Sequence, residues 1–299
     1  PLPVELITGF LDIYHSPDFT LPPTLSDIPT LLTVHDLSFL RDPESAAPGL
    51  RGYLEVAVKR SVQLATHVLA DSQSTKNDLI ELYATPEDKI TVLYAGVSSI
   101  FRPITDLDQL MKVRKRYKLG DQPFVLSVGT LQPRKNHATL IKAFELTLMD
   151  SDYNLVLAGG QGWSYEEVYD LVRSRGLQHR VLFPGFVADE DLSALYSSAD
   201  VMAFPSLYEG FGLPVVEAMR CGCPVIASRR GSLPEVVGEG GRLVEPDDIS
   251  GLAEEMQRII DDDQWRETMR AKGFENAGRF SWQQIAEKTL ALYHEVASP

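Results

Sequence analysis

Short runs of β-branched and aliphatic residues alternate along this chain with longer segments whose apolar residues recur at helical spacing. Such alternation is typical of βα units built around a parallel sheet. We therefore expect an α/β protein with two doubly wound halves. The predicted strands cover residues 12–16, 30–36, 67–72 and 89–96 in the first half, and 124–129, 154–160, 180–185, 200–206, 224–228 and 241–245 in the second.

The segments between these strands predict helices. Residues 137–148 place Leu140, Ile141, Phe144 and Leu148 on one apolar stripe, which indicates a helix packed on a sheet. In the first half the predicted helices cover 53–65 and 74–84, with Ser74 as the N-cap of the second. Three more helices are expected after Gly251, the last over 281–296.

The periodic pattern is interrupted after Phe101, where the segment FRPITDLDQ contains a proline and has no regular apolar spacing. We place a domain boundary there. The first domain is predicted to cover residues 1–103 and the second 104–281, and the C-terminal helix 282–299 is expected to pack back on the first. In open sheets of this type, ligands bind beyond the carboxyl ends of the strands, where the strand order reverses.

Composition narrows the function classes. The chain has 299 residues and a formal net charge of -14, and its densest basic stretch, residues 112–118, reads as the solvated face of a helix. Binding to nucleic acid is therefore disfavoured, because it relies on clustered Lys and Arg. Cys221 and Cys223 are expected to be buried thiols, since one Cys-x-Cys pair suits neither zinc nor a disulfide. We expect a cytoplasmic protein, at most peripheral at the inner membrane face.

Glycine-rich turns follow several strands of the second half. None has the spacing of a dinucleotide fingerprint or a P-loop, which argues against nicotinamide binding and ATP hydrolysis. In SLYEGFGLPVVEAMR, Gly210 and Gly212 let the backbone approach a ligand, and the start of the next helix suits a diphosphate. Arg134 and Lys135 would add counter-charge, and Glu217 would accept hydrogen bonds from ribose hydroxyls.

Glu209 and Glu217, with seven residues between them, resemble the Glu-x7-Glu motif of the family 4 retaining glycosyltransferases, which have the GT-B fold. The segments GTLQPRKNHATLIKAF, LVLAGG, VLFPGFV and GSLPEVVGEGGRLVEPDD resemble the donor-binding domain of that family, in its order. HSPDF, LLTVHDLSF and ADSQSTKNDL resemble the second part of its acceptor domain. The resemblance implies two Rossmann-type sheets facing across a cleft, with the N-terminal one truncated.

The same resemblance implies roles for individual residues. Arg134 and Lys135 would bind the diphosphate, Glu217 the ribose, and Glu209 the hydroxyls of the donor sugar near the reacting carbon, while His35 would reach the donor sugar from the acceptor side. Catalysis would then be electrostatic stabilisation of a departing diphosphate, with no metal and no cofactor beyond the nucleotide sugar. The further donor-binding positions are Gly129, Phe183, Gly185, Gly210, Phe211, Gly212, Leu213, Pro214 and Val215.

The function that follows is a retaining hexosyltransferase of polysaccharide biosynthesis. GDP-mannose and UDP-glucose are the favoured donors, and a saccharide or lipid-linked hydroxyl is the expected acceptor. Two alternatives remain open. The chain would be a nucleotide-sugar binding protein that no longer transfers, or only slowly hydrolyses its donor, or it would be a sugar-nucleotide epimerase on the same fold.

The chain begins at Pro1, and the strand, glycine-rich loop and helix that open the acceptor domain of the family have no counterpart in it. The strand near Ile13 would then present an unpaired sheet edge, which invites pairing. We expect either that residues 1–10 fold over this edge or that two chains meet there as a homodimer.

Overall fold

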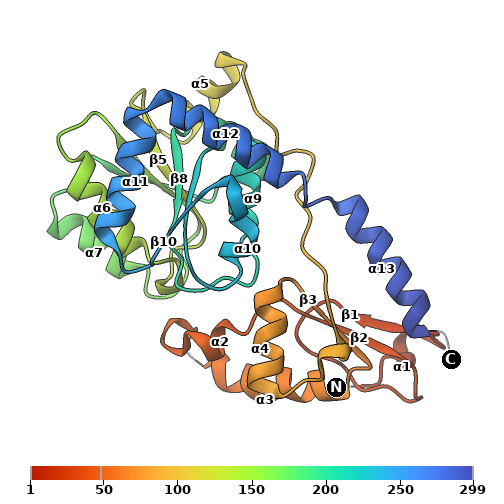
Figure 1. The fold of residues 1–299 in the computed structure, drawn as a ribbon. Coiled ribbons are helices and arrows are strands. Elements are labelled where there is room, and N and C mark those ends of the chain that lie inside the picture. The colour runs from red at the N-terminus through yellow and green to blue at the C-terminus, as the bar shows by residue number, and fades with distance from the viewer. Residues whose placement is uncertain (1, 48, 298–299) are drawn as a thin grey trace. The chain divides into compact units, whose positions relative to one another are not determined.

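The structure is a computed structural model that describes residues 2–47 and 49–297 (Figure 1). The described chain forms two compact units. The first comprises the residues up to Gly96 together with Glu209–Phe211 and the segment from Ser281 onward. The second comprises Val97–Tyr208 and Gly212–Phe280. Each unit is built on its own parallel sheet.

The first unit has a four-stranded sheet in the order β1-β2-β3-β4, and all its neighbouring strands are parallel. Leu32 and Val34 of β2 and Val68 of β3 pack on one face against Val58 of α3 and Leu79 of α4. The strands are β1 (Tyr14–Ser16), β2 (Thr30–Val34), β3 (His67–Ala70) and β4 (Ile90–Val92), and the helices are α1 (Glu5–Thr8), α2 (Ser38–Arg41), η1 (Pro43–Ser45), α3 (Leu50–Leu64), α4 (Gln73–Tyr83), η2 (Glu87–Lys89) and α13 (Trp282–Ala297).

The C-terminal helix α13 covers the other face of this sheet. Leu292 contacts Leu31 of β2 and Leu69 of β3 in a small apolar cluster. Beside that cluster, the Nδ1 atom of His15 and the Tyr293 hydroxyl share a hydrogen bond of 2.6 Å. The last helix of the chain therefore belongs to the same unit as the first strands.

The second unit has a six-stranded parallel sheet in the order β10-β9-β8-β5-β6-β7. The chain enters at β5, runs outward through β6 and β7, and then returns to build the other half from β8 to β10, so the order reverses between β5 and β8. The strands are β5 (Phe124–Val128), β6 (Asn154–Ala158), β7 (Val181–Gly185), β8 (Val201–Phe204), β9 (Val225–Ser228) and β10 (Arg242–Val244).

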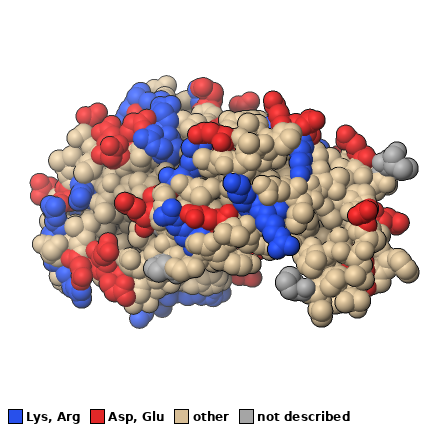
Figure 2. Space-filling model, turned by 90° about the horizontal axis from the view of Figure 1, so that it is seen from below, with Lys and Arg blue, Asp and Glu red and all other residues tan. Residues whose placement is uncertain are grey.

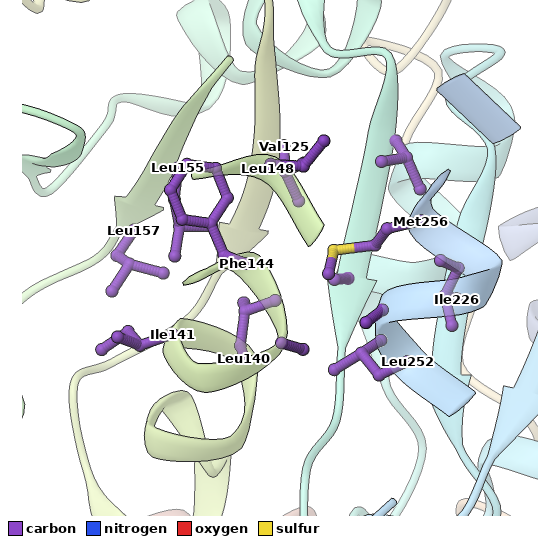
Figure 3. Packing of buried hydrophobic residues seen from close by; sticks show 14 of the residues in the cluster. Val125, Leu140, Ile141, Phe144, Leu148, Leu155, Leu157, Ile226, Leu252 and Met256 are labelled. Carbon is purple, nitrogen blue, oxygen red and sulfur yellow. The ribbon is translucent and has the colours of Figure 1, made fainter. Parts of the chain in front are cut away.

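Helices cover both faces of this sheet. Helices α6 and α11 lie side by side on one face, where Phe144 and Met256 pack with Val125, Leu155 and Ile226 of the strands (Figure 3). The helices of this unit are α5 (Leu107–Arg116), η3 (Pro133–Lys135), α6 (His137–Leu148), α7 (Glu166–Ser174), α8 (Asp189–Ser198), α9 (Leu213–Arg220), α10 (Leu233–Val237), η4 (Gly238–Gly240), α11 (Ile249–Asp261) and α12 (Asp263–Ala277).

The structure contains all ten predicted strands, each ending within the predicted range, and α6 has the bounds predicted from its apolar stripe. One local prediction was wrong. The N-cap of α4 is Ser72, whose hydroxyl accepts a hydrogen bond from the Thr75 N–H, and Ser74 lies inside the helix. Ser72 takes this place because its backbone is still extended, as an N-cap requires.

Cys221 and Cys223 are free and buried, as expected. Burial raises the pKa of the Cys221 thiol to about 12, so this thiol stays protonated at neutral pH. Within the described part of the chain, no helix is both long and apolar enough for a bilayer span. On the face seen in Figure 2, Lys and Arg are interspersed with Asp and Glu.

The N-terminal segment is held by the loop that joins β1 to β2. The Val4 N–H donates to the Pro23 carbonyl oxygen at 3.1 Å, and the Glu5 carboxylate accepts from the Leu25 N–H at 2.9 Å. In the described residues, β1 is hydrogen-bonded to β2 on one side only, and no strand pairs with its other edge.

Candidate functional site

The site begins where the strand order of the second sheet reverses. The loops that leave the carboxyl ends of β5 and β8 carry Gly129, Arg134 and Lys135 on one side and Gly212 on the other. Gly129 has a positive φ of 153°, and a Cβ atom there would lie 3.2 Å from Cε of Lys135. A glycine at this position therefore lets the lysine side chain pack directly over the end of β5.

Hydrogen bonds join the β5 loop to the β8 loop. An Arg134 guanidinium N–H donates to the Tyr208 carbonyl oxygen at 2.7 Å, and the Leu207 N–H donates to the Arg134 carbonyl oxygen at 2.8 Å. The Lys135 ammonium lies 4.7 Å from the centre of the Phe204 ring. Both cations are thus fixed beside the end of β8 within the second unit.

Helix α9 opens directly from the β8 loop. Gly212 is its N-cap, with a φ of 98° that favours glycine, and it offers no side chain to cap the helix. A Cβ atom at this position would lie 2.8 Å from the Leu233 side chain. Pro214 lies in the first turn, where a proline costs no hydrogen bond, and Val215 is fully buried. Leu213 remains partly exposed.

Glu217 follows in the second turn of α9 and is half-buried. The Tyr196 hydroxyl of α8 donates a hydrogen bond to its Oε2 atom at 2.9 Å. Burial raises the pKa of Glu217 to about 7; the Tyr196 bond opposes that rise and the charge of Asp189 adds to it. The carboxylate is therefore poised to titrate near neutral pH and is held by one phenol.

Phe183 and Gly185 end strand β7, at the same edge of the sheet, because the carboxyl ends of parallel strands share one edge. The Phe183 ring stacks on Tyr169 of α7 with ring centres 4.3 Å apart. Gly185 has a φ of 75°, and its carbonyl oxygen accepts from the Gly159 N–H. These two residues lie two strands away from β5 in the sheet order.

His35 belongs to the first unit, at the carboxyl end of β2. Its Nδ1 atom and the Asp71 carboxylate are 2.7 Å apart, and this hydrogen bond is the main cause that raises the pKa of His35. The charge of Asp18, 4.0 Å away, raises it further. His35 is therefore protonated to a larger extent near neutral pH than an isolated histidine.

The three residues of the Gly-x-Gly turn that precede α9 also group with the first unit. Glu209 is buried there, and Phe211 lies with its ring centre 6.1 Å from that of Tyr94. A Cβ atom on Gly210 would fall 2.1 Å from the His35 carbonyl oxygen, so this turn needs a glycine.

The structure thus sorts the predicted site residues into two sets. Within the second unit it brings the residues of the β5 loop and of α9 together and adds Tyr196, which the sequence analysis missed. Within the first unit it brings His35 together with Glu209–Phe211. In the described chain, no three His, Cys, Asp or Glu side chains are grouped so as to hold a metal ion.

This fold defines a class: two parallel α/β sheets, with glycine-rich turns, a basic loop and a half-buried carboxylate near the switch point of the second. The chain belongs to the glycosyltransferases, since the family "Glycosyl transferases group 1" matches residues 111–276 and "Glycosyltransferase Family 4" matches residues 10–99. The predicted family is thereby confirmed.

Named relatives agree with this assignment. The chain is 36% identical to the O-antigen chain mannosyltransferase B of Escherichia coli, covering 94% of this chain and 74% of that protein. It spans only about 35% of the longer E. coli mannosyltransferases WbdA. The polypeptide is thus related to enzymes that transfer sugars.

Solved structures show the same fold. Sucrose-phosphate synthase from Thermosynechococcus elongatus aligns with a TM-score of 0.78 at 30% identity, covering 91% of this chain and 69% of that one. Anabaena HepE in complex with UDP and glucose aligns with a TM-score of 0.76 at 28% identity, covering 88% and 71%. The predicted GT-B-like α/β fold is therefore confirmed.

Proposed function

We propose that the second unit binds a nucleotide-diphosphate sugar and that the chain transfers its hexose, with retention of configuration, to a saccharide or lipid-linked hydroxyl. The observation that carries this proposal is the placement of Glu217. Its half-buried carboxylate lies in the second turn of α9, whose N-terminus opens at the switch point beside the Arg134 and Lys135 loop. A helix N-terminus with two nearby cations suits a diphosphate, and an acid one turn further suits a pentose diol.

In this proposal Arg134, Lys135 and the first turn of α9 neutralise the diphosphate, both in the bound donor and as it departs. Stabilisation of the developing charge on the leaving group is the catalytic contribution, and it requires no metal. Glu209 would bind the transferred hexose, and His35 would reach it from the first unit. Addition of EDTA should leave turnover unchanged.

Mannose is the first sugar to test, because the E. coli relatives named above, 36% and 31% identical to this chain, are mannosyltransferases. UDP-glucose is the second, because HepE has been solved with UDP and glucose. GDP-mannose and UDP-glucose should be titrated into the protein by calorimetry. Saturable binding of either one supports the proposal, and no heat with either contradicts it.

Glu217→Ala should weaken binding of the better donor by about 1–3 kcal/mol, as expected when a charged hydrogen-bond acceptor is lost. Glu254→Ala is the matched control, since Glu254 is an exposed acid on α11. It should bind like the wild type. Equal affinity of the wild type and Glu217→Ala would contradict the role of Glu217.

Donor turnover with and without acceptor separates transfer from the binding-only alternative. Faster release of the nucleotide when a mannose oligosaccharide is added supports transfer, whereas equal slow release supports hydrolysis alone. Incubation with UDP-N-acetylglucosamine and analysis of the recovered sugar tests the epimerase alternative.

The proposal includes a homodimer through the free edge of β1 and a cytoplasmic site of action beside the membrane. Light scattering after size-exclusion chromatography tests the dimer: a monomeric mass at every protein concentration measured contradicts it. Sedimentation with and without lipid vesicles tests the peripheral association.

A further inference from the structure

Tyr196 is a fully buried tyrosine beside the candidate donor site. It lies on α8, its exposed fraction is 0%, and the Phe101 ring packs against it edge-on at 6.2 Å. A buried phenol hydroxyl requires a hydrogen-bond partner. Its partner is the carboxylate of Glu217, at 2.9 Å.

A carboxylate has about four positions at which it can accept a hydrogen bond, and the phenol occupies one of them on Oε2. The residue is only half-buried, so part of the Glu217 side chain still faces solvent. A phenol fixed by burial would hold the carboxylate plane in one orientation. The second oxygen would then be left for the hydroxyls of a ligand.

We propose that Tyr196 is a positioning residue for nucleotide recognition: its hydroxyl fixes Glu217 through Oε2 so that the remaining acceptor positions receive the ribose hydroxyls of the donor. This inference rests on the proposed function and extends it to a residue that touches no ligand. It implies that a residue of α8 contributes to the preference of the protein for a ribose over a deoxyribose donor.

The electrostatics add a measurable consequence. Burial favours the neutral form of Glu217, whereas the phenol bond favours the carboxylate. Asp189 on α8 favours the neutral form as well, and Cys221 at the end of α9 is a buried thiol that stays protonated. Where α10 and α12 pack on α9, Leu233 lies against Gly212, the Asn276 amide lies against Met219, and the Arg220 guanidinium lies over the Phe274 ring. Loss of the phenol bond should therefore raise the pKa of Glu217.

The first test combines a change in the protein, Tyr196→Phe, with a change in the ligand, the loss of its 2′-hydroxyl. The better donor of GDP-mannose and UDP-glucose is titrated into the wild type and Tyr196→Phe, and its 2′-deoxyribose analogue is titrated into both. For the natural donor, Tyr196→Phe should bind roughly threefold to tenfold more weakly, as for one lost hydrogen bond. For the deoxy analogue the affinities of the two proteins should differ by much less, because this ligand lacks the 2′-hydroxyl that the oriented Glu217 carboxylate would bind.

A second readout is the pH profile of the same binding. Sugar nucleotides carry a diphosphate esterified at both ends, so the ligand has no phosphate proton that titrates near neutral. Wild-type affinity should fall as pH decreases through about 7, where Glu217 becomes protonated. In Tyr196→Phe the midpoint should lie at higher pH, and in Glu217→Gln this component of the profile should be absent.

Tyr117→Phe is the matched control. The Tyr117 hydroxyl also donates to a carboxylate on α8, that of Asp191, at 2.9 Å. Its removal perturbs the same helix without touching Glu217. This variant should keep the wild-type affinity, the wild-type midpoint and the wild-type preference for ribose.

The outcomes separate the two proposals. No binding of any donor by the wild type would overturn the proposed function. Donor binding by the wild type with an equal loss for natural and deoxy donors in Tyr196→Phe, or with no loss and no shift of the pH midpoint, would overturn the role of Tyr196 alone. If Tyr196→Phe does not fold, the wild-type ratio of natural to deoxy affinity decides. That ratio should shrink below pH 7, and a ratio independent of pH overturns the inference.

Discussion

The two units of this chain are both built from βα units, but they differ in how completely their strands are buried. The second unit has six strands, and β6, β8 and β9 are buried along their whole length. The first has four, and the edge strand β1 contributes three residues. Its N-terminal segment leaves Leu6, Ile7 and Phe10 exposed.

This difference bears on function. In the second unit, hydrogen bonds join the β5 loop to the β8 loop at the switch point and fix Arg134 beside Tyr208. In the first unit, His35 lies at the end of β2 and is hydrogen-bonded to the carboxylate of Asp71. On the proposed function, we therefore expect donor binding to depend mainly on the better-packed second unit.

The strongest test of this contrast removes one aromatic ring from each unit. Phe144→Ala, in the core of the second unit, should cost about 3–5 kcal/mol of unfolding free energy, because it leaves a large cavity. Phe10→Ala, in the first unit, should change stability by less than about 0.5 kcal/mol, because Phe10 is fully exposed.

Hydrogen exchange read by mass spectrometry on peptides from each unit reports these effects separately. Phe144→Ala should accelerate exchange in the strands of the second sheet. Equal stability losses for the two variants would show that Phe10 is covered in solution and would contradict the contrast.

The strands and helix α6 of the second unit were predicted well because their bounds depend on short patterns in the sequence. Strands buried on both faces appear as continuous apolar runs, and α6 carries its whole core face in one stripe, so bounds and burial follow from the sequence. The glycine turns and Glu217 could be proposed as site residues from the sequence because they lie at short spacings along it. The N-cap at Ser72 was missed by two residues, since Ser72, Ser74 and Thr75 lie close together and each could cap a helix.

Tyr196 could not be found by such reasoning. It lies 21 residues before Glu217, on a different helix, and their contact exists only because α8 and α9 pack side by side. The available signal was a tyrosine beside the apolar residues Leu192, Ala194 and Leu195 of its helix, since a buried phenol usually has a hydrogen-bond partner. The sequence also gave no reason to group Glu209–Phe211 with the first unit, because tertiary contacts decide that grouping.

A smaller effect is expected from the site itself. The pKa of Glu217 in the folded chain, about 7, lies above its ordinary value of 4.5. The neutral form therefore stabilises the fold, fully below pH 4.5, and this contribution is lost as pH rises through about 7. Glu217→Gln, which resembles the neutral form, should stabilise the donor-free protein by about 1–2 kcal/mol at pH 8, while it weakens donor binding.

Thermal unfolding at pH 5 and pH 8 checks this expectation. The gain from Glu217→Gln should be present at pH 8 and should nearly vanish at pH 5, where the wild-type residue is itself protonated. A gain of equal size at both pH values would show that the charge of Glu217 is not the cause.

The smallest effect belongs to the first unit. Asp71 raises the pKa of His35 above its ordinary value of 6.5, so the protonated pair stabilises the fold below pH 6.5, and this contribution is lost as pH rises through the raised value. Both side chains are partly exposed to solvent, which limits the contribution to less than about 1 kcal/mol. Asp71→Asn should therefore destabilise the first unit slightly at pH 6 and hardly at pH 8.5, so its effect is visible at low pH, whereas that of Glu217→Gln is visible at high pH. Nuclear magnetic resonance titration of the His35 ring checks the cause directly, because its pKa should fall in Asp71→Asn. An unchanged His35 titration would mean that the hydrogen bond between His35 and Asp71 does not form in solution.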